Sequence, residues 1–251
     1  MRRLSAAAAG AAACGLLFTA ASAQGPQGYL TADAVDAVAV VGPPPAAGSP
    51  AGAADVAAYR AAAADVDTPR WTQARDDDDV RTPAVLKRYA CALDAELDPA
   101  RAPATVRLLE RSLRDADAIS GVAKKTYRRP RPFAADDPAA PLCLDIPPER
   151  RATSSFTYPS GHATLGALWG LILIEAAPDR AGAVAARSRA FVESRQVCRV
   201  HYPSDLAAGE RLGAAIFARL QASADYAADV AAARAEIAAA PKPAGCGGQA
   251  S

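Results

Sequence analysis

The chain has 251 residues, enough for one large domain or two small ones, and a single core is the simpler interpretation. Its 28 lysines and arginines nearly balance its 27 aspartates and glutamates. Charge of one sign therefore does not dominate the surface, and composition gives no support to a nucleic-acid partner or to attachment at an anionic membrane surface. Histidine and cysteine are scarce, so their positions are informative.

Residues 1–23 have the features of a secretory signal peptide. Two arginines precede a small apolar stretch, and an Ala-Ser-Ala sequence ending at Ala23 matches the A-x-A pattern that signal peptidase accepts. The apolar part is shorter than the ~20 residues that span a bilayer, which argues against stable membrane insertion. A lipoprotein start at Cys14 is an alternative, but it would leave most of the apolar run in the mature chain. We expect a periplasmic or secreted protein that begins at Gln24, which the intact mass of the exported form would test.

The next segment, residues 24–81, is predicted to be an N-terminal arm. It is rich in Ala, Gly and Pro as far as about residue 70, a composition that favours an extended, polyproline-like conformation. The acidic run RDDDDV, residues 75–80, lacks the alternating carboxylates and the glycine of an EF-hand loop. We interpret this run as a solvated loop without a function.

Beyond Thr82 the apolar spacing is typical of helices, and little of the chain alternates as strands do. The predicted helices cover residues 83–97, 102–129, 162–177, 179–200, 203–222 and 229–240, with a loop over 132–161. The stretch 162–177 is apolar all round but too short to span a membrane, so we expect a buried core helix. The sequence thus predicts an all-α, single-domain helical bundle over residues 82–240, followed by a flexible tail at 241–251.

Three polar clusters interrupt these helices, and the first is basic. In KKTYRRPRPF, Lys124 and Arg131 are seven residues apart, and the prolines on both sides of Arg131 place it in the first loop residues. Taken alone, the cluster is typical of a helix C-terminus whose basic residues match the helix dipole.

The second cluster, FTYPSGHATLG, contains one of the two histidines. Pro159 and Gly161 predict a tight turn, and Ser160 can cap the helix that follows. The free N–H groups of Gly161 and His162 would then form an anion site at a helix N-terminus. An ordinary capped helix with a histidine in its first turn is the alternative.

The third cluster, SRQVCRVHYPSD, contains the other histidine. Asp205 follows His201 by four residues, within reach of one ring nitrogen, so it can fix the tautomer and leave the other nitrogen free to attack. Arg195 supplies a planar fork suited to phosphate oxygens. The alternative is a helix-start histidine in a salt bridge with Asp205.

Together the clusters read K-x6-R-P, P-S-G-H and S-R-x5-H-x3-D, which resembles the three-part signature of the type 2 phosphatidic acid phosphatase and vanadium haloperoxidase superfamily. Within it the chain is most similar to the bacterial class A non-specific acid phosphatases, through PPPAAGS in the arm, Y-x-R-x-RPF at residues 127–133 and D-x3-G-x-R-x2-G at residues 205–213. Two departures, Tyr202 for a frequent tryptophan and Ala163 for threonine or serine, bear on substrate preference. The resemblance implies that the arm packs against the body.

The resemblance also implies an acid phosphatase that hydrolyses small phosphate monoesters without a metal or any other cofactor. In that mechanism His201, held by Asp205, attacks phosphorus to form a phosphohistidine, and His162 protonates the leaving alcohol and later activates water. The groups implied to hold the phosphate oxygens are Lys124, Arg131, Ser160, the Gly161 amide and Arg195. One proton shared between two histidines suits a pH of about 5 to 6. Phosphate and vanadate are the expected inhibitors.

Three other functions are considered. A vanadate-dependent haloperoxidase would use the same anion site, with His201 as the metal ligand. A phospholipid or isoprenoid phosphate phosphatase of the superfamily would normally have several membrane spans. A non-enzymatic phosphate-binding protein would leave the two histidines and Asp205 without a role. The sequence is compatible with a homodimer and does not identify the natural substrate.

The cysteines are expected to form disulfides. Loss of Cys14 with the signal leaves an even number in an oxidising compartment, namely Cys91, Cys143, Cys198 and Cys246. With no C-x-x-C pair and only two histidines, a metal site is not expected. Among the three possible arrangements we favour Cys143 with Cys198, because both flank segments that converge on the proposed phosphate pocket.

Overall fold

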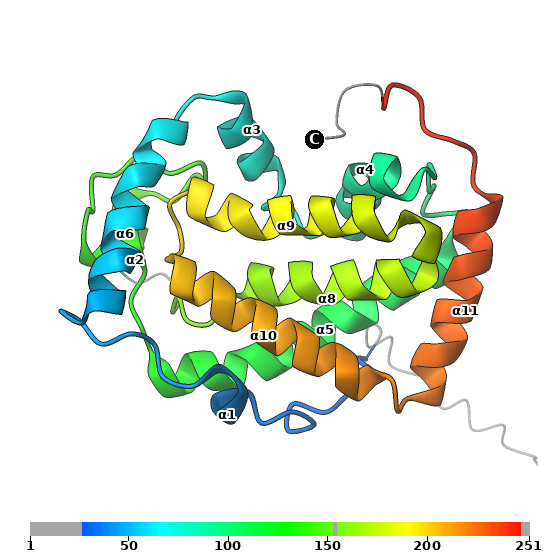
Figure 1. Ribbon diagram of the computed structural model, residues 1–251, viewed down its shortest axis with the longest axis horizontal. Helices are drawn as coiled ribbons and strands as arrows, with labels where there is room; N and C mark the ends of the chain where they lie inside the picture. The colour runs from blue at the N-terminus through cyan, green and yellow to red at the C-terminus, as the bar shows by residue number, and fades with distance from the viewer. Residues whose placement is uncertain (1–26, 153–154, 247–251) are drawn as a thin grey trace, which may run out of the picture.

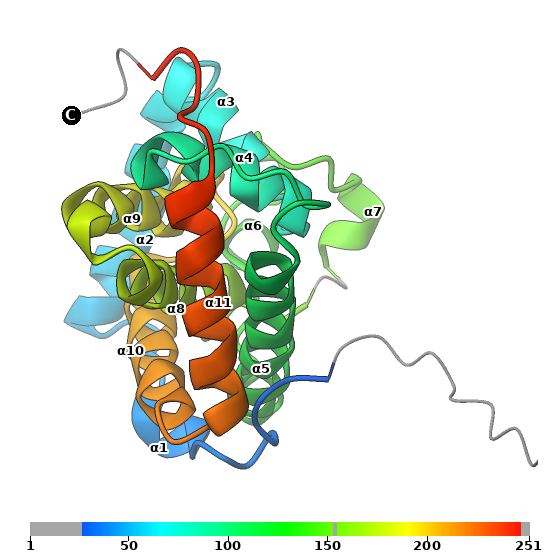
Figure 2. The same cartoon turned by 90° about the vertical axis from the view of Figure 1, so that its right-hand side faces the viewer.

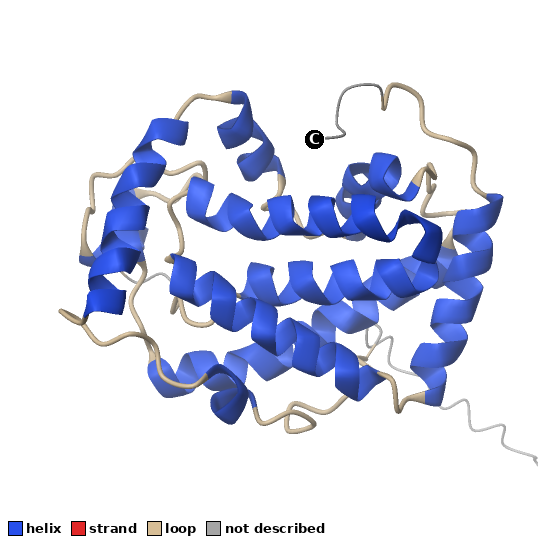
Figure 3. Ribbon diagram, in the orientation of Figure 1, coloured by secondary structure: helices blue, strands red, loops and turns tan. Residues whose placement is uncertain are grey.

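A computed structural model describes residues 27–152 and 155–246. The predicted signal peptide, residues 1–23, lies outside the described residues. Over the described ranges the chain forms helices and loops and contains no strand (Figure 3). The predicted all-α fold is therefore confirmed.

The helices in chain order are α1 (Ala37–Val41), α2 (Pro50–Ala61), the 3-10 helix η1 (Ala62–Asp65), α3 (Pro69–Asp76), α4 (Thr82–Leu93), α5 (Pro103–Tyr127), α6 (Pro132–Ala135), α7 (Pro148–Arg151), α8 (Gly161–Ala176), the 3-10 helix η2 (Pro178–Arg180), α9 (Ala181–Val197), α10 (Pro203–Leu220) and α11 (Ala224–Ala239). Helices α5, α8, α9 and α10 begin and end within three residues of the predicted ranges. Helix α4 ends at Leu93 rather than at residue 97, and α11 begins at Ala224, five residues before its predicted start. The predicted loop over 132–161 additionally contains two single-turn helices, α6 and α7.

Helix α8 forms the centre of the core. Apolar residues occupy all of its faces, which is typical of a helix with neighbours on every side, and Leu168, Trp169 and Ile172 are buried. Helices α9 and α10 lie beside it and α5 behind it (Figure 1). The prediction of a buried core helix is confirmed. In the part of the chain that the structure describes, helices long and apolar enough to cross a membrane are absent.

Helices α8 and α10 pack backbone to backbone. A Cβ added at Gly209 of α10 would lie 2.6 Å from the carbonyl oxygen of Ser160, and one added at Gly213 would lie 2.5 Å from that of Thr164. Such distances leave no room for a side chain, so only glycine allows this approach. The start of α8 is thereby held against the start of α10.

One end of the bundle gathers several helix termini. Helices α8 and α10 begin at the left of Figure 1, where α5 and α9 end, and the N-terminal helices α2 and α3 lie at the same end. Helix α11 closes the opposite end, packed on α5 and α8 (Figure 2). Side chains from both halves of the sequence can therefore meet at the left end.

The N-terminal arm differs in conformation from the extended segment that its composition favours, because α2 and α3 form within it. The side chains of Ser49 and Thr68 cap these helices, and each cap precedes a proline at the first helical position. Alanine, the strongest helix former, supplies much of α2. Tyr59 and Trp71 then bury their rings against the body, as the resemblance implies for the arm.

The acidic run after α3 is also not a solvated loop. Asp77 is fully buried, accepts a hydrogen bond of 2.6 Å from the Ser194 hydroxyl, and forms an ion pair with Arg187. A charge is buried at low cost only where it is paired and hydrogen-bonded, as here. The interpretation of this run as solvated is therefore wrong, and Asp77 instead joins the arm to α9.

Two disulfides are present, as expected from the cysteine count. Cys91 pairs with Cys246 with a Cα–Cα distance of 5.5 Å, and Cys143 pairs with Cys198 at 4.8 Å. The favoured pairing of Cys143 with Cys198 is confirmed. It ties the loop before α8 to the end of α9, beside the end of the bundle where the helix termini gather.

The glycine contacts predict a selective loss of stability. In Gly213→Ala the new methyl group meets main-chain atoms of α8, so we expect the free energy of unfolding to fall by about 1–3 kcal/mol. In Gly121→Ala on α5, where a Cβ meets nothing within 4 Å, we expect a gain of about 0.5–1 kcal/mol from helix propensity. Urea unfolding of both variants measures the difference, and equal stability of the two would contradict backbone contact between α8 and α10.

Candidate active site

The structure brings all the predicted site residues to the end of the bundle where α8 and α10 begin. They come from four places along the chain: the end of α5 and its following loop, the start of α8, the end of α9 and the start of α10. The residues are Lys124, Arg131, Ser160, Gly161, His162, Arg195, His201 and Asp205.

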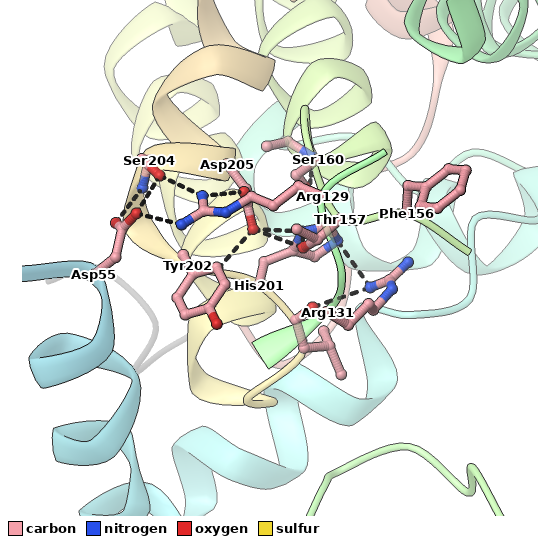
Figure 4. A network of polar contacts seen from close by, with 12 residues as sticks. Asp55, Arg129, Arg131, Phe156, Thr157, Ser160, His201, Tyr202, Ser204 and Asp205 are labelled. Atoms are coloured by element: carbon pink, nitrogen blue, oxygen red, sulfur yellow. Dashed lines mark hydrogen bonds and ion pairs between the residues drawn. The ribbon is translucent and has the colours of Figure 1, made fainter. Parts of the chain in front are cut away.

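The hydrogen bonds of His201 fix its tautomer (Figure 4). Its Nε2 lies 3.0 Å from Nη1 of Arg131. A guanidinium can only donate, so Nε2 must present its lone pair and the ring proton must be on Nδ1. Nδ1 then donates to the Thr157 hydroxyl, 2.8 Å away. The unprotonated Nε2 is therefore the nucleophilic atom of this ring, and it is directed at the cationic groups.

Asp205 reaches His201 mainly through Thr157. The Thr157 hydroxyl donates to Oδ2 of Asp205 at 2.6 Å, whereas His201 Nδ1 lies 3.4 Å from the same oxygen. The predicted pairing of His201 with Asp205 is present, but the shorter path includes a hydroxyl that the sequence analysis missed. Thr157 is in the FTYPSGH stretch, yet no spacing rule indicates that its side chain turns toward a histidine 44 residues later.

Arg129 supports Asp205 from the side opposite His201. Its Nη1 donates to Oδ1 of Asp205 at 2.8 Å, and its Nη2 donates to Asp55 of α2 at 2.8 Å. Burial raises the pKa of Asp205, and Arg129 opposes that shift. The guanidinium lies over the ring of Tyr202, 4.1 Å from its centroid. Arg129 and Asp55 were also missed, although Arg129 stands in the Y-x-R-x-RPF stretch.

Lys124 and Arg131 place two positive charges close together. Lys124 Nζ donates to the carbonyl of Phe156 at 2.9 Å. Burial, followed by the charge of Arg131, lowers the pKa of Lys124 to about 7. Burial and the charge of Arg195 lower the pKa of Arg131 to about 10. Each cation is thus destabilised by lost hydration and by its neighbours, and an anion among them would relieve both effects.

Arg195 supplies donors that have no protein partner. Its side chain is 2% exposed, and among the described residues neither Nε nor Nη1 has a hydrogen-bond acceptor. Its Nη2 is paired, 3.0 Å from Oδ1 of Asp78. Buried donors are nearly always satisfied in folded proteins, so two free ones on one guanidinium indicate a place for a ligand oxygen.

The start of α8 adds main-chain donors. Ser160 is the N-cap, and its hydroxyl accepts from the Ala163 amide at 3.2 Å. The amides of Gly161 and His162 belong to the first turn, where a helix offers no carbonyl partner, and they add to the positive end of the helix dipole. The predicted cap is confirmed.

His162 contacts Asp78 of the acidic run. Its Nε2 lies 3.1 Å from the main-chain oxygen of Asp78 and 3.5 Å from Oδ1 of that residue. Burial and the charge of Arg195 lower the pKa of His162 well below its usual value. Burial and the charge of Arg131 do the same for His201. Both imidazoles are therefore neutral at neutral pH before an anion binds.

Carboxylates, thiols and imidazoles do not form a group of three or more that could hold a metal ion in the described ranges. The chemistry of the site, as far as these residues define it, is that of a cationic anion site beside two neutral imidazoles.

Comparison with known proteins agrees with this geometry. An acid phosphatase of Zymomonas mobilis subsp. mobilis is 36% identical over 202 residues, which cover 80% of this chain and 75% of that protein. Residues 112–227 match the PAP2 superfamily model. The chain belongs to the PAP2 superfamily. The resemblance inferred from the three motifs is thereby confirmed, and the matched range contains every predicted site residue.

Two further relatives show the range of the superfamily. A non-specific acid phosphatase of Salmonella typhimurium is 36% identical over 180 residues, 71% of each chain. A decaprenylphosphoryl-5-phosphoribose phosphatase of Mycobacterium tuberculosis is 36% identical over 101 residues, 40% of this chain and 51% of that protein. This PAP2 chain therefore shares more of its length with the acid phosphatases than with the lipid-linked phosphatase.

The lowered pKa of Lys124 predicts pH-dependent anion binding. Below pH 7 the ammonium is charged and attracts an anion; as pH rises through its pKa of about 7, that attraction is lost. Sulfate is a suitable probe because it stays a dianion throughout. We expect its affinity to decline above pH 7, and the step to vanish in Lys124→Gln. The exposed Lys125→Gln is the control. Calorimetric titration that finds the same step in Lys124→Gln would assign it to another group.

Proposed function

We propose that this PAP2 protein is an acid phosphatase that hydrolyses phosphate monoesters through a phosphohistidine on His201, without a metal. The observation that best supports this is the fixed tautomer of His201, whose Nε2 lone pair lies among the cations of the site. The names of its relatives favour the same class of substrate.

In the first step Nε2 of His201 attacks phosphorus, the new P–N bond forms, and the ester P–O bond breaks. The departing oxygen takes a proton from His162, which becomes neutral. His201 gains positive charge in this step. The Thr157 hydroxyl accepts a hydrogen bond from Nδ1–H and in turn donates one to Asp205, so the carboxylate stabilises that charge.

In the second step His162 accepts a proton from water, whose oxygen attacks phosphorus while the P–N bond breaks. Phosphate leaves, and His201 returns to its neutral form. His162 holds the proton at the end of the cycle and is ready for the next ester. One histidine thus serves as nucleophile and the other as acid and then base.

Charge on the three equatorial oxygens is stabilised by groups that are in place before the reaction. The free N–H groups of Arg195, the ammonium of Lys124 and the guanidinium of Arg131 supply positive charge, and Ser160 and the Gly161 amide supply further donors. Metal ions do this in many other phosphoryl transfer enzymes. In this proposal the cations replace them.

The acidic working range follows from the same groups. Both histidines have a lowered pKa in the free protein. A bound phosphate dianion raises the pKa of a neighbouring imidazole, so protonated His162 exists chiefly in the complex and at acid pH. The two disulfides favour an exported, oxidising location, in agreement with the predicted signal peptide.

The first experiment is hydrolysis of a panel of phosphate esters in excess chelator. We expect turnover of nitrophenyl and alkyl phosphates, with competitive inhibition by phosphate and vanadate. Activity lost with EDTA and restored by zinc or magnesium would contradict the metal-free mechanism. Preference for phosphatidic acid or a polyprenyl phosphate would favour a lipid phosphatase, and halide oxidation with added vanadate would favour a haloperoxidase.

Replacing each histidine by alanine should change turnover in a different way. His201→Ala should lose turnover of every ester, because the P–N bond cannot form. His162→Ala should lose roughly 10²- to 10⁴-fold with an alkyl ester, whose oxygen needs a proton to depart. With a nitrophenyl ester it should still release a burst of nitrophenol before slow hydrolysis. Rapid-quench kinetics of both variants provides the test; a burst from His201→Ala and none from His162→Ala would reverse the roles.

A further inference from the structure

Asp78 of the acidic run contacts two residues of the active site. Its Oδ1 pairs with Arg195 Nη2 at 3.0 Å and lies 3.5 Å from Nε2 of His162, while its main-chain oxygen lies 3.1 Å from the same nitrogen. One residue of the loop after α3 therefore contacts an arginine of α9 and a histidine of α8. The neighbouring Asp79 forms its ion pair with Arg81 on the surface instead.

These contacts determine which nitrogen of His162 can act as the acid. A carbonyl oxygen can only accept a hydrogen bond, so Nε2 of His162 must bear a proton and donate a hydrogen bond to the main-chain oxygen of Asp78. In the neutral ring Nδ1 is then the unprotonated nitrogen. It is also the one nitrogen left to take up a second proton and deliver it to a leaving group, since Nε2 remains bound to Asp78.

We propose that Asp78 is a positioning residue for His162: its main-chain oxygen accepts from Nε2–H and so leaves Nδ1 to face the ester oxygen, and its carboxylate stabilises the imidazolium that transfers the proton. This inference rests on the proposed role of His162 as the acid. Each histidine of the site then has its own carboxylate, with Asp205 serving the nucleophile and Asp78 serving the acid.

The charges around His162 disfavour the imidazolium that the acid role requires. Arg195 of α9, Arg131 of the loop before α6 and Lys124 of α5 all disfavour its protonation, as does burial. The hydrogen bond from Nε2 to the main-chain oxygen of Asp78 acts in the opposite direction, and the Asp78 carboxylate, 3.5 Å from the same nitrogen, brings a negative charge beside the ring. In Asp78→Asn the imidazolium would keep the three cations as neighbours and lose the carboxylate that pairs with Nε2.

Asp78 also borders a cavity of about 1080 Å³ whose lining includes the loop at residues 141–148.

The test compares Asp78→Asn, which removes the charge and keeps the size, with Asp79→Asn as a matched control. We expect kcat of Asp78→Asn to fall at least about 10-fold with an alkyl phosphate and less than about 3-fold with nitrophenyl phosphate, because only the alkyl ester needs the acid. Asp79→Asn should change neither. If Asp78 served only to orient Arg195, both esters would lose equally and through KM, and that result would overturn the proposal.

A second measurement does not depend on turnover. The chain has only two histidines, so ¹⁵N-histidine NMR assigns both rings by comparison with His201→Asn. With saturating inorganic phosphate, we expect the pKa of His162 to be lower by about 1 unit in Asp78→Asn. An unchanged pKa would overturn the proposal. If the unmodified protein hydrolyses no phosphate ester, the proposed function fails, yet this titration still decides whether Asp78 controls the proton on His162.

Discussion

The structure depends on one unfavourable arrangement, three cationic side chains held together away from water. Burial and mutual repulsion lower the pKa of Lys124 and of Arg131, and two N–H groups of Arg195 have no acceptor among the described residues. A protein chain does not collect such groups for stability, because each is better hydrated at the surface. Their cost is recovered when a tetrahedral anion binds among them. Since the donors are already in place, little reorganisation is needed when charge develops on the phosphate oxygens.

The rest of the fold keeps these cations from separating. Gly209 and Gly213 hold the start of α10 against α8, which fixes His201 and Asp205 relative to Ser160. On the far side, fully buried Asp77 accepts a hydrogen bond from Ser194, the residue before Arg195. Buried carboxylates are thus placed behind the cations, where they anchor the main chain and the imidazoles and leave the free N–H groups of Arg195 unpaired.

The sequence predicts the scaffold and the catalytic groups better than it predicts what supports them. Helices α5, α8 and α10 follow from apolar spacing and proline positions, and the site residues follow from the family resemblance that three short motifs carry together. Asp55, Asp78 and Thr157 do not follow, because their contacts are tertiary and join segments far apart in the chain. Composition also misleads at two places. The Ala- and Pro-rich arm has the composition of extended chain, yet capped helices form within it. The run of four aspartates has the composition of a solvated loop, yet it contains a buried ion pair.

The two histidines differ in whether Nε2 bears a proton. On His201 the arginine contact requires a bare Nε2, whereas on His162 the carbonyl contact requires a protonated Nε2. Because both rings have a lowered pKa in the free protein, a second proton is disfavoured on either ring, and an anion among the cations favours it. A phosphate monoester below its second pKa of about 6 carries a proton of its own. In the proposed mechanism that proton can pass to His162 as the ester becomes a dianion among the cations. The acidic range then reflects the ionisation of the substrate as much as that of the enzyme.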